Sequence, residues 1–224
     1  MYEVERIIIE VVSAVLYFTL VRYMYKPYSL TGEKKYLGLP LGFAFLGISE
    51  IFLTIQIIYP SIQLPGLSVA TRTFAFVFLA ITYFFAAKPT RNNQMLWTIT
   101  LSLITIIAAI LCIILVGAPL LNLQVPMGFS IFLRILGLFF VGYISLHALN
   151  SHIKRPDPTT IWIPLGFVML GLSQYSQIIR VLDNGYAYGG AFIGGIVSRF
   201  IGIAIFLYVA YRTFHGNDKR DNTK

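Results

Sequence analysis

Long apolar stretches separated by short polar segments run along the whole chain. A helix that crosses a membrane needs about 20 mostly apolar residues. Seven stretches reach this length, at approximately 7–25, 37–59, 66–87, 95–117, 127–149, 161–182 and 189–211. The segments between them are too short to hold a folded domain, and several carry proline or glycine, which favour turns. The pattern therefore predicts an all-α multipass membrane protein with seven transmembrane helices.

The composition points in the same direction. Hydrophobic residues make up 57% of the 224 residues and charged residues only 12%, whereas a soluble domain carries about 25% charged residues. The chain has too few charges to cover a surface that faces water, so we expect the lipid bilayer to be its solvent. In that setting, the net charge of +8 reflects basic residues on the cytoplasmic side, and no nucleic-acid partner is expected.

Lysine and arginine are concentrated in alternate loops. The first, third and fifth loops and the C-terminal tail are basic, whereas the second loop (60–65) and the fourth (118–126) contain no charged residue. The positive-inside rule then places the N-terminus outside and the C-terminus in the cytoplasm. The residues before the first stretch are acidic, so no cleaved signal peptide is expected. We expect a plasma membrane; the lack of disulfides and of Asn-x-Ser/Thr sites is compatible with a prokaryotic one.

One motif occurs twice and indicates an internal repeat. Residues 40–58 read PLGFAFLGISEIFLTIQII, and residues 164–182 read PLGFVMLGLSQYSQIIRVL. At a constant offset of 124 positions, eight of these nineteen residues are identical, which is more than apolar composition alone would give. Two weaker matches align Thr71-Arg72 with Ser198-Arg199 and Arg6-Ile7-Ile8 with Arg134-Ile135-Leu136. The first three helices therefore repeat as the last three.

The repeat divides the chain into four parts. Residues 1–93 form the first three-helix repeat, 94–118 a linker helix, 119–212 the second three-helix repeat and 213–224 a cytoplasmic tail. With one helix between them, the two repeats run in the same direction, related by an axis along the membrane normal. The linker lacks internal glycine and charge, so we expect it at the periphery, facing lipid. Proline is tolerated in the first turn of a helix, so the repeated motif marks helix starts.

The three-one-three order of the seven helices, with the N-terminus outside, resembles the SWEET and PQ-loop sugar transporters. The resemblance covers the topology of the whole chain, and it implies transport by rocking of one three-helix repeat against the other. Those families carry a Pro-Gln signature at a hinge, whereas this chain has Pro-Leu-Gly-Phe near a helix start. No functional residue is therefore carried over from them.

Charged residues inside the apolar stretches are the most informative positions. Each costs about 2.5–3.5 kcal/mol at the centre of a membrane helix on insertion scales, so they should face one another or a water-filled cavity. At a rise of about 1.5 Å per residue, five of them lie in the outer half of the membrane. Together with the glutamine that the repeat aligns with Glu50, they form the candidate ligand-binding set: Glu10, Glu50, Arg72, Arg134, Gln174 and Arg199.

This set favours a pocket for an anionic or polyhydroxyl small molecule that enters from outside. Three arginines against two glutamates leave one surplus positive charge, and guanidinium groups suit carboxylate or phosphate. A small residue follows each arginine by three positions, which would leave space beside the guanidinium: Ala75, Gly137 and Gly202. The same residues also fit internal ion pairs without a ligand, with Arg72 and Arg134 extending toward the membrane surface, or a proton relay through Glu50.

Several other classes are disfavoured. No Ser-His-Asp set is visible, and the three histidines and the single cysteine, Cys112, show no metal-ligand spacing, so neither an enzyme nor a metal site is expected. All lysines lie in loops or the tail, which argues against a retinal protein of the rhodopsin type. Gly38-x-x-x-Gly42 and Gly190-x-x-x-Gly194 have the spacing of close helix contacts, which we expect within the chain.

The sequence therefore favours a multipass binding or transport protein with an arginine-containing pocket. Two other interpretations stay open at this point. One is a seven-helix sensory module that binds a ligand and signals through a separate partner protein. The other is an accessory subunit of a larger membrane complex, in which the arginines would be structural. Flux of a solute would distinguish a transporter from the other two classes. Co-purification with partner proteins, without ligand binding or flux, would identify an accessory subunit.

Overall fold

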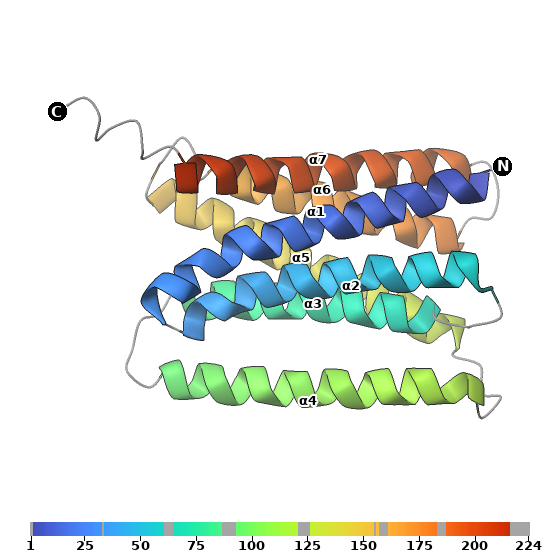
Figure 1. Cartoon of the computed structure of the whole chain (residues 1–224), viewed down its shortest axis with the longest axis horizontal. Coiled ribbons are helices and arrows are strands. Elements are labelled where there is room, and N and C mark those ends of the chain that lie inside the picture. The colour runs from blue at the N-terminus through green and yellow to red at the C-terminus, as the bar shows by residue number, and fades with distance from the viewer. Residues whose placement is uncertain are drawn as a thin grey trace.

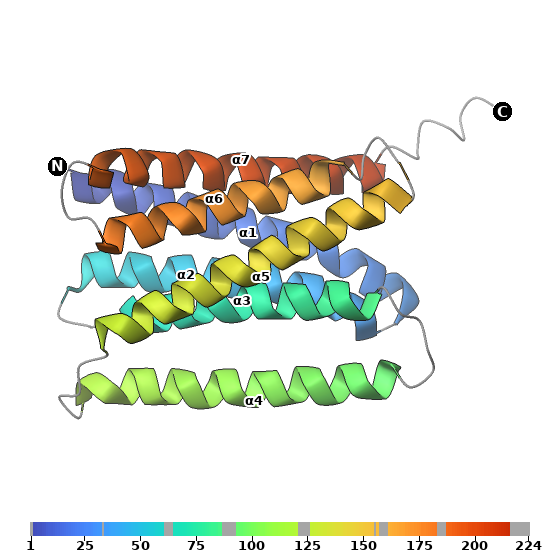
Figure 2. The same ribbon diagram turned by 180° about the vertical axis from the view of Figure 1, so that it is seen from behind.

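The computed structural model is a bundle of long helices (Figures 1 and 2). It describes residues 2–32, 34–60, 65–86, 93–120, 126–154, 156, 161–182 and 187–215, and these ranges contain no strand. The elements are α1 (Tyr2–Thr31), the 3-10 helix η1 (Lys34–Leu37), α2 (Gly38–Ile58), α3 (Pro65–Ala86), α4 (Asn93–Leu120), α5 (Met127–Lys154), α6 (Trp162–Leu182) and α7 (Ala187–His215). The prediction of an all-α chain is confirmed.

Six of the described helices, α2 to α7, are long and apolar enough to cross a membrane. This agrees with a multipass membrane protein. α1 falls short of the same measure, and it carries Glu3, Glu5, Arg6 and Glu10 near its start. Figure 1 shows α1 running beside the other helices along the bundle. Its membrane crossing and the orientation of the bundle stay predictions.

α1 extends beyond both ends of the apolar stretch 7–25 from which it was predicted. It continues through Pro27 to Thr31, although proline inside a helix removes one backbone hydrogen bond. Side chains replace part of that bonding: the hydroxyl of Ser29 donates to the Lys26 carbonyl at 2.9 Å, and that of Thr31 to the Pro27 carbonyl at 2.8 Å. Gly32 follows the helix with a φ of 69°, which glycine adopts at little cost.

The repeated motif lies in the first turns of its two helices, as predicted. α2 begins two residues before Pro40, and α6 begins two residues before Pro164. The missing N–H group of proline would have no partner within these turns. At the other end of the chain, α7 continues to His215. The first three residues of the expected tail 213–224 are therefore helical, and the rest lie outside the described residues.

The helices contact one another in two consecutive groups. α2 packs against α1 and α3, and α6 packs against α5 and α7; the groups meet where α3 contacts α5 and α1 contacts α7. Among the described elements, the α4 backbone runs close to α3 and η1, and both views place α4 at the edge of the bundle (Figures 1 and 2). The order of contacts is the same in the two groups, whereas the duplication itself stays a prediction.

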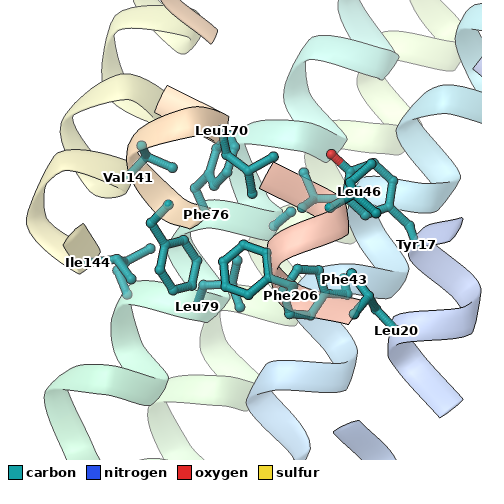
Figure 3. Close-up of a cluster of buried hydrophobic side chains, with 14 residues drawn as sticks. Tyr17, Leu20, Phe43, Leu46, Phe76, Leu79, Val141, Ile144, Leu170 and Phe206 are labelled. Carbon is teal, nitrogen blue, oxygen red and sulfur yellow. The ribbon is translucent and has the colours of Figure 1, made fainter. Parts of the chain in front are cut away.

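The main apolar core draws side chains from every helix except α4 (Figure 3). The phenylalanines of the repeated motif, Phe43 and Phe167, are both buried there. Both pack against Phe206 of α7, with ring centroids 5.3 Å and 4.7 Å away, respectively. The motif thus supplies one core ring from each three-helix group, and these rings bring α2, α6 and α7 together.

The two glycine pairs occupy different environments. A Cβ added at Gly42 would lie 2.5 Å from Cγ of Leu79 on α3, and one at Gly38 would also collide with α3. This pair lets α2 and α3 approach closely, as predicted. A Cβ at Gly190 or Gly194 would meet nothing within 4 Å. The expectation that the second pair packs inside the chain is therefore wrong for the described residues.

Candidate functional site

A chain of buried ion pairs links α1, α2, α3 and α7. The Glu50 carboxylate lies between two arginines: Oε1 is 2.8 Å from Nη2 of Arg72, and Oε2 is 2.8 Å from Nη1 of Arg199. The same Nη1 lies 2.6 Å from Oε2 of Glu10. All four side chains are at most 7% exposed. Two carboxylates therefore neutralise two guanidinium groups inside the bundle.

Helical spacing turns these charges inward. Glu10 shares one face of α1 with Ala14 and Tyr17, which follow at i+4 and i+7, and all three are buried. On α3, Arg72 is held against α2 by a second contact, because its Nε donates a hydrogen bond to Oγ of Ser49 at 3.3 Å. Burial with these partners avoids the cost of a charge exposed to lipid.

A cavity of about 240 Å³ opens next to this network. Its lining comes from α1, α2, α5, α6 and α7, near the starts of α1, α5 and α7 and the ends of α2 and α6. The cavity therefore lies toward one end of the bundle. Its polar lining residues are Arg6, Glu10, Arg134, Ser173, Gln177, Arg180 and Arg199.

The six predicted ligand-binding residues divide into two sets. Three line the cavity: Glu10, Arg134 and Arg199. Three are buried or bonded outside its lining: Glu50, Arg72 and Gln174. Glu50 and Arg72 thus have the geometry of the internal ion pairs considered above, while Arg134 has that of a pocket residue. Arg199 takes part in both arrangements, since it lines the cavity and holds both carboxylates.

Arg134 bonds to a neutral group rather than to a carboxylate. Its Nη1 donates a hydrogen bond to Oε1 of Gln177 at 2.9 Å, and the described residues give it no ion pair. The Nε atoms of Arg6, Arg134 and Arg199 are buried without a hydrogen-bond partner among the described residues. Arg180 stacks on an aromatic ring, with its guanidinium carbon 4.8 Å from the Phe192 centroid, a favourable cation–π distance.

The small residues that follow the arginines serve helix packing. A Cβ at Gly202 would lie 3.1 Å from the carbonyl oxygen of Gly166, so α7 approaches the α6 backbone there. A Cβ at Gly137 would lie 3.4 Å from the Phe76 ring and 3.5 Å from the amide nitrogen of Gln174. The expectation that these two glycines leave space beside a guanidinium is therefore wrong, because their nearest neighbours belong to other helices.

Two arginines of the lining were not among the predicted site residues. Arg6 lies just before the predicted apolar stretch 7–25, in the part of α1 that the length criterion left out. Arg180 lies near the end of α6, where a basic residue is usually a solvated helix end. The sequence does contain a pattern that indicates a polar lining at Arg180. Ser173, Gln177 and Arg180 occupy positions i, i+4 and i+7 and therefore share one helix face.

Comparisons with known proteins add no assignment. A scan of protein-family models found no match to the chain, and neither did searches of curated proteins and of solved structures. The fold and composition define the class as an α-helical protein in which six of the described helices are long and apolar enough to span a membrane. Any finer function has to be argued from the cavity and the ion pairs beside it.

Proposed function

We propose that this chain is an integral membrane protein that binds a small anion in the cavity and transports it across the membrane. The observation that carries this proposal is the composition of the lining, in which four arginines from four helices face a single glutamate. Guanidinium groups bind carboxylate and phosphate oxygens through paired, charge-assisted hydrogen bonds. Ionisable residues that face a cavity inside a membrane protein mark a functional site by default.

The ion pairs beside the cavity support transport over binding alone. Arg199 belongs to α7, whereas Glu10 and Glu50 belong to α1 and α2, so these contacts join the two three-helix groups. An anion that competes for Arg199 would weaken its hold on the carboxylates. The groups could then rock against each other, which is how transporters built from paired repeats expose a site to each side in turn.

The distribution of basic residues supports entry of the anion from outside. The cavity lies at the end where α1 begins and α2 ends, and the positive-inside rule assigns that end to the outer side. The basic loops and tail would then lie at the opposite end of the bundle. A plasma membrane fits this arrangement, because a solute outside the cell would reach the arginines directly.

Purified protein reconstituted into liposomes tests the proposal. Binding of acetate, succinate, inorganic phosphate and chloride would be measured by thermal shift, and uptake by radiolabel, with protein-free liposomes as the control. Saturable uptake of at least one of these anions is expected. Binding without uptake would overturn transport and favour the sensory module. Neither binding nor uptake would overturn the proposal and favour an accessory subunit.

A further inference from the structure

The charges around the cavity do not cancel. Glu10 and Glu50 are matched by Arg72 and Arg199, so this network of four residues is neutral. Among the described residues, Arg134 donates a hydrogen bond to the neutral amide of Gln177, at 2.9 Å, and forms no ion pair. Arg6, which lines the cavity, forms no ion pair among the described residues. Arg6 and Arg134 therefore each leave one positive charge that a ligand can balance, whereas Arg180, the fourth arginine of the lining, stacks on the Phe192 ring.

Arg6 and Arg134 approach the cavity from different three-helix groups. They lie on α1 and α5, and the sequences Arg6-Ile7-Ile8 and Arg134-Ile135-Leu136 correspond in the predicted repeat. The Nε donor of each is buried without a hydrogen-bond partner among the described residues. A buried donor left unsatisfied is costly. Each arginine thus offers a charged donor to its own acid group on a ligand.

The size of the cavity limits the length of such a ligand. A dry protein cavity of about 150 Å³ holds benzene, which has about six heavy atoms. By proportion, a cavity of about 240 Å³ holds about ten heavy atoms. A dicarboxylate with four or five carbons has about eight or nine, whereas phosphate has about five and would fill only half of the space.

We infer that the ligand is a small linear dicarboxylate, with one carboxylate on Arg6 and the other on Arg134. This inference rests on the proposed function and names the class of anion. Both carboxylates are ionised near neutral pH, so the ligand brings the two negative charges that balance the two arginines. Bound in this way, the ligand would lie between the two three-helix groups, beside the Arg199 ion pairs that join them.

Binding of three probes to the purified full-length chain tests this inference: succinate, butyrate and inorganic phosphate. Butyrate has the same carbon chain as succinate with one carboxylate fewer. Succinate is expected to bind at least about tenfold more tightly than butyrate, as the loss of a charge-assisted contact implies. Equal binding of butyrate, or tighter binding of phosphate, would overturn the dicarboxylate while leaving anion binding intact. Failure of all three would overturn the dicarboxylate, and failure of acetate and chloride as well would overturn the proposed function.

Substitution of Arg6 and Arg134 tests whether each arginine binds one carboxylate of the ligand. Arg6→Gln and Arg134→Gln should each weaken succinate binding about 10- to 100-fold and leave butyrate binding within a few fold, so the preference for succinate disappears. Arg22→Gln, which changes an exposed arginine on the same helix as Arg6, is the matched control and should keep the preference. If a glutamine variant does not fold, Arg6→Lys and Arg134→Lys keep the charge and should lower the preference. An unchanged preference in the folded variants would overturn the inference.

Discussion

Arg72 and Arg199 hold opposite oxygens of one carboxylate, that of Glu50, at 2.8 Å each. Arg72 comes from α3 in the first three-helix group, and Arg199 comes from α7 in the second. The two arginines also occupy corresponding positions in the predicted repeat. Glu50 is therefore fixed from both groups at once, and its charge is the point on which the ion-pair network depends.

Replacing Glu50 with glutamine should destabilise the protein more than the same change at Glu10. Glu50→Gln leaves Arg72 without a carboxylate in a buried position, which costs about 3–5 kcal/mol. Glu10→Gln leaves Arg199 bound to Glu50, so only a charged hydrogen bond worth about 1.5–3 kcal/mol is lost. Thermal and denaturant unfolding of both variants in one detergent measures the difference. Equal losses would show that Arg72 does not depend on Glu50.

Removing the negative charge of Glu10 should strengthen anion binding. Glu10 is the single carboxylate among the described lining residues, where it repels an anion and competes with it for Arg199. At an effective dielectric constant of about 20, one charge about 10 Å away changes affinity by at least about fivefold. Titration of Glu10→Gln with succinate should show tighter binding than in the unmodified protein. Glu3→Gln, at an exposed position of the same helix, should change little, and weaker binding by Glu10→Gln would contradict the assignment.

Alanine at Gly42 should destabilise the bundle, whereas alanine at Gly194 should not. The new methyl group at Gly42 would overlap Leu79 and press on the carbonyl of Ala75, and such overpacking costs about 1–3 kcal/mol. At Gly194 the methyl group meets open space, and alanine favours the helix by up to about 1 kcal/mol. Midpoints of thermal unfolding compare the two variants. A stable Gly42→Ala variant would mean that α2 and α3 can separate without loss.

Cysteine labelling tests the predicted orientation. In a Cys112→Ser background, Glu3→Cys and Lys154→Cys place one exposed thiol near the start of α1 and one at the end of α5. These positions lie at opposite ends of the bundle (Figures 1 and 2). A membrane-impermeant maleimide should label Glu3→Cys in intact cells and Lys154→Cys only after permeabilisation. The opposite result would place the cavity on the cytoplasmic side.

The number and order of the helices followed from apolar length, because a membrane segment must reach about 20 residues. Apolar length did not predict where the helices end, because it takes no account of polar groups that form hydrogen bonds within a helix. Pro27 shows this: it was expected to lie in a loop, yet the hydroxyl groups of Ser29 and Thr31 bond the carbonyls beside it and the helix continues. The start of α1 also went beyond the apolar stretch, because its first residues are charged.

The sequence predicts the depth of the charged residues in the membrane better than it predicts which residues they pair with. Rise per residue placed Glu50 and Arg199 at similar depths, and they do form an ion pair. Which partner a charged side chain meets depends on the rotation of its helix about the helix axis. That rotation is set by packing between helices. Arg134 lies near the same level but turns toward Gln177 on α6. Arg180 lies in the last turn of α6, where a basic residue usually faces solvent, so the sequence alone does not mark it as a site residue.

The apolar core of Figure 3 has a consequence for permeability. It lies beyond the cavity along the five helices that line the cavity, and its fourteen side chains include the packed rings of Phe43 and Phe206. An ion that left the cavity inward would have to enter this apolar layer, where an unpaired charge is extremely costly. In the conformation described here, this apolar layer would oppose the passage of an ion. The speed of any transport would depend on how fast these rings separate, independently of how tightly the arginines hold the anion.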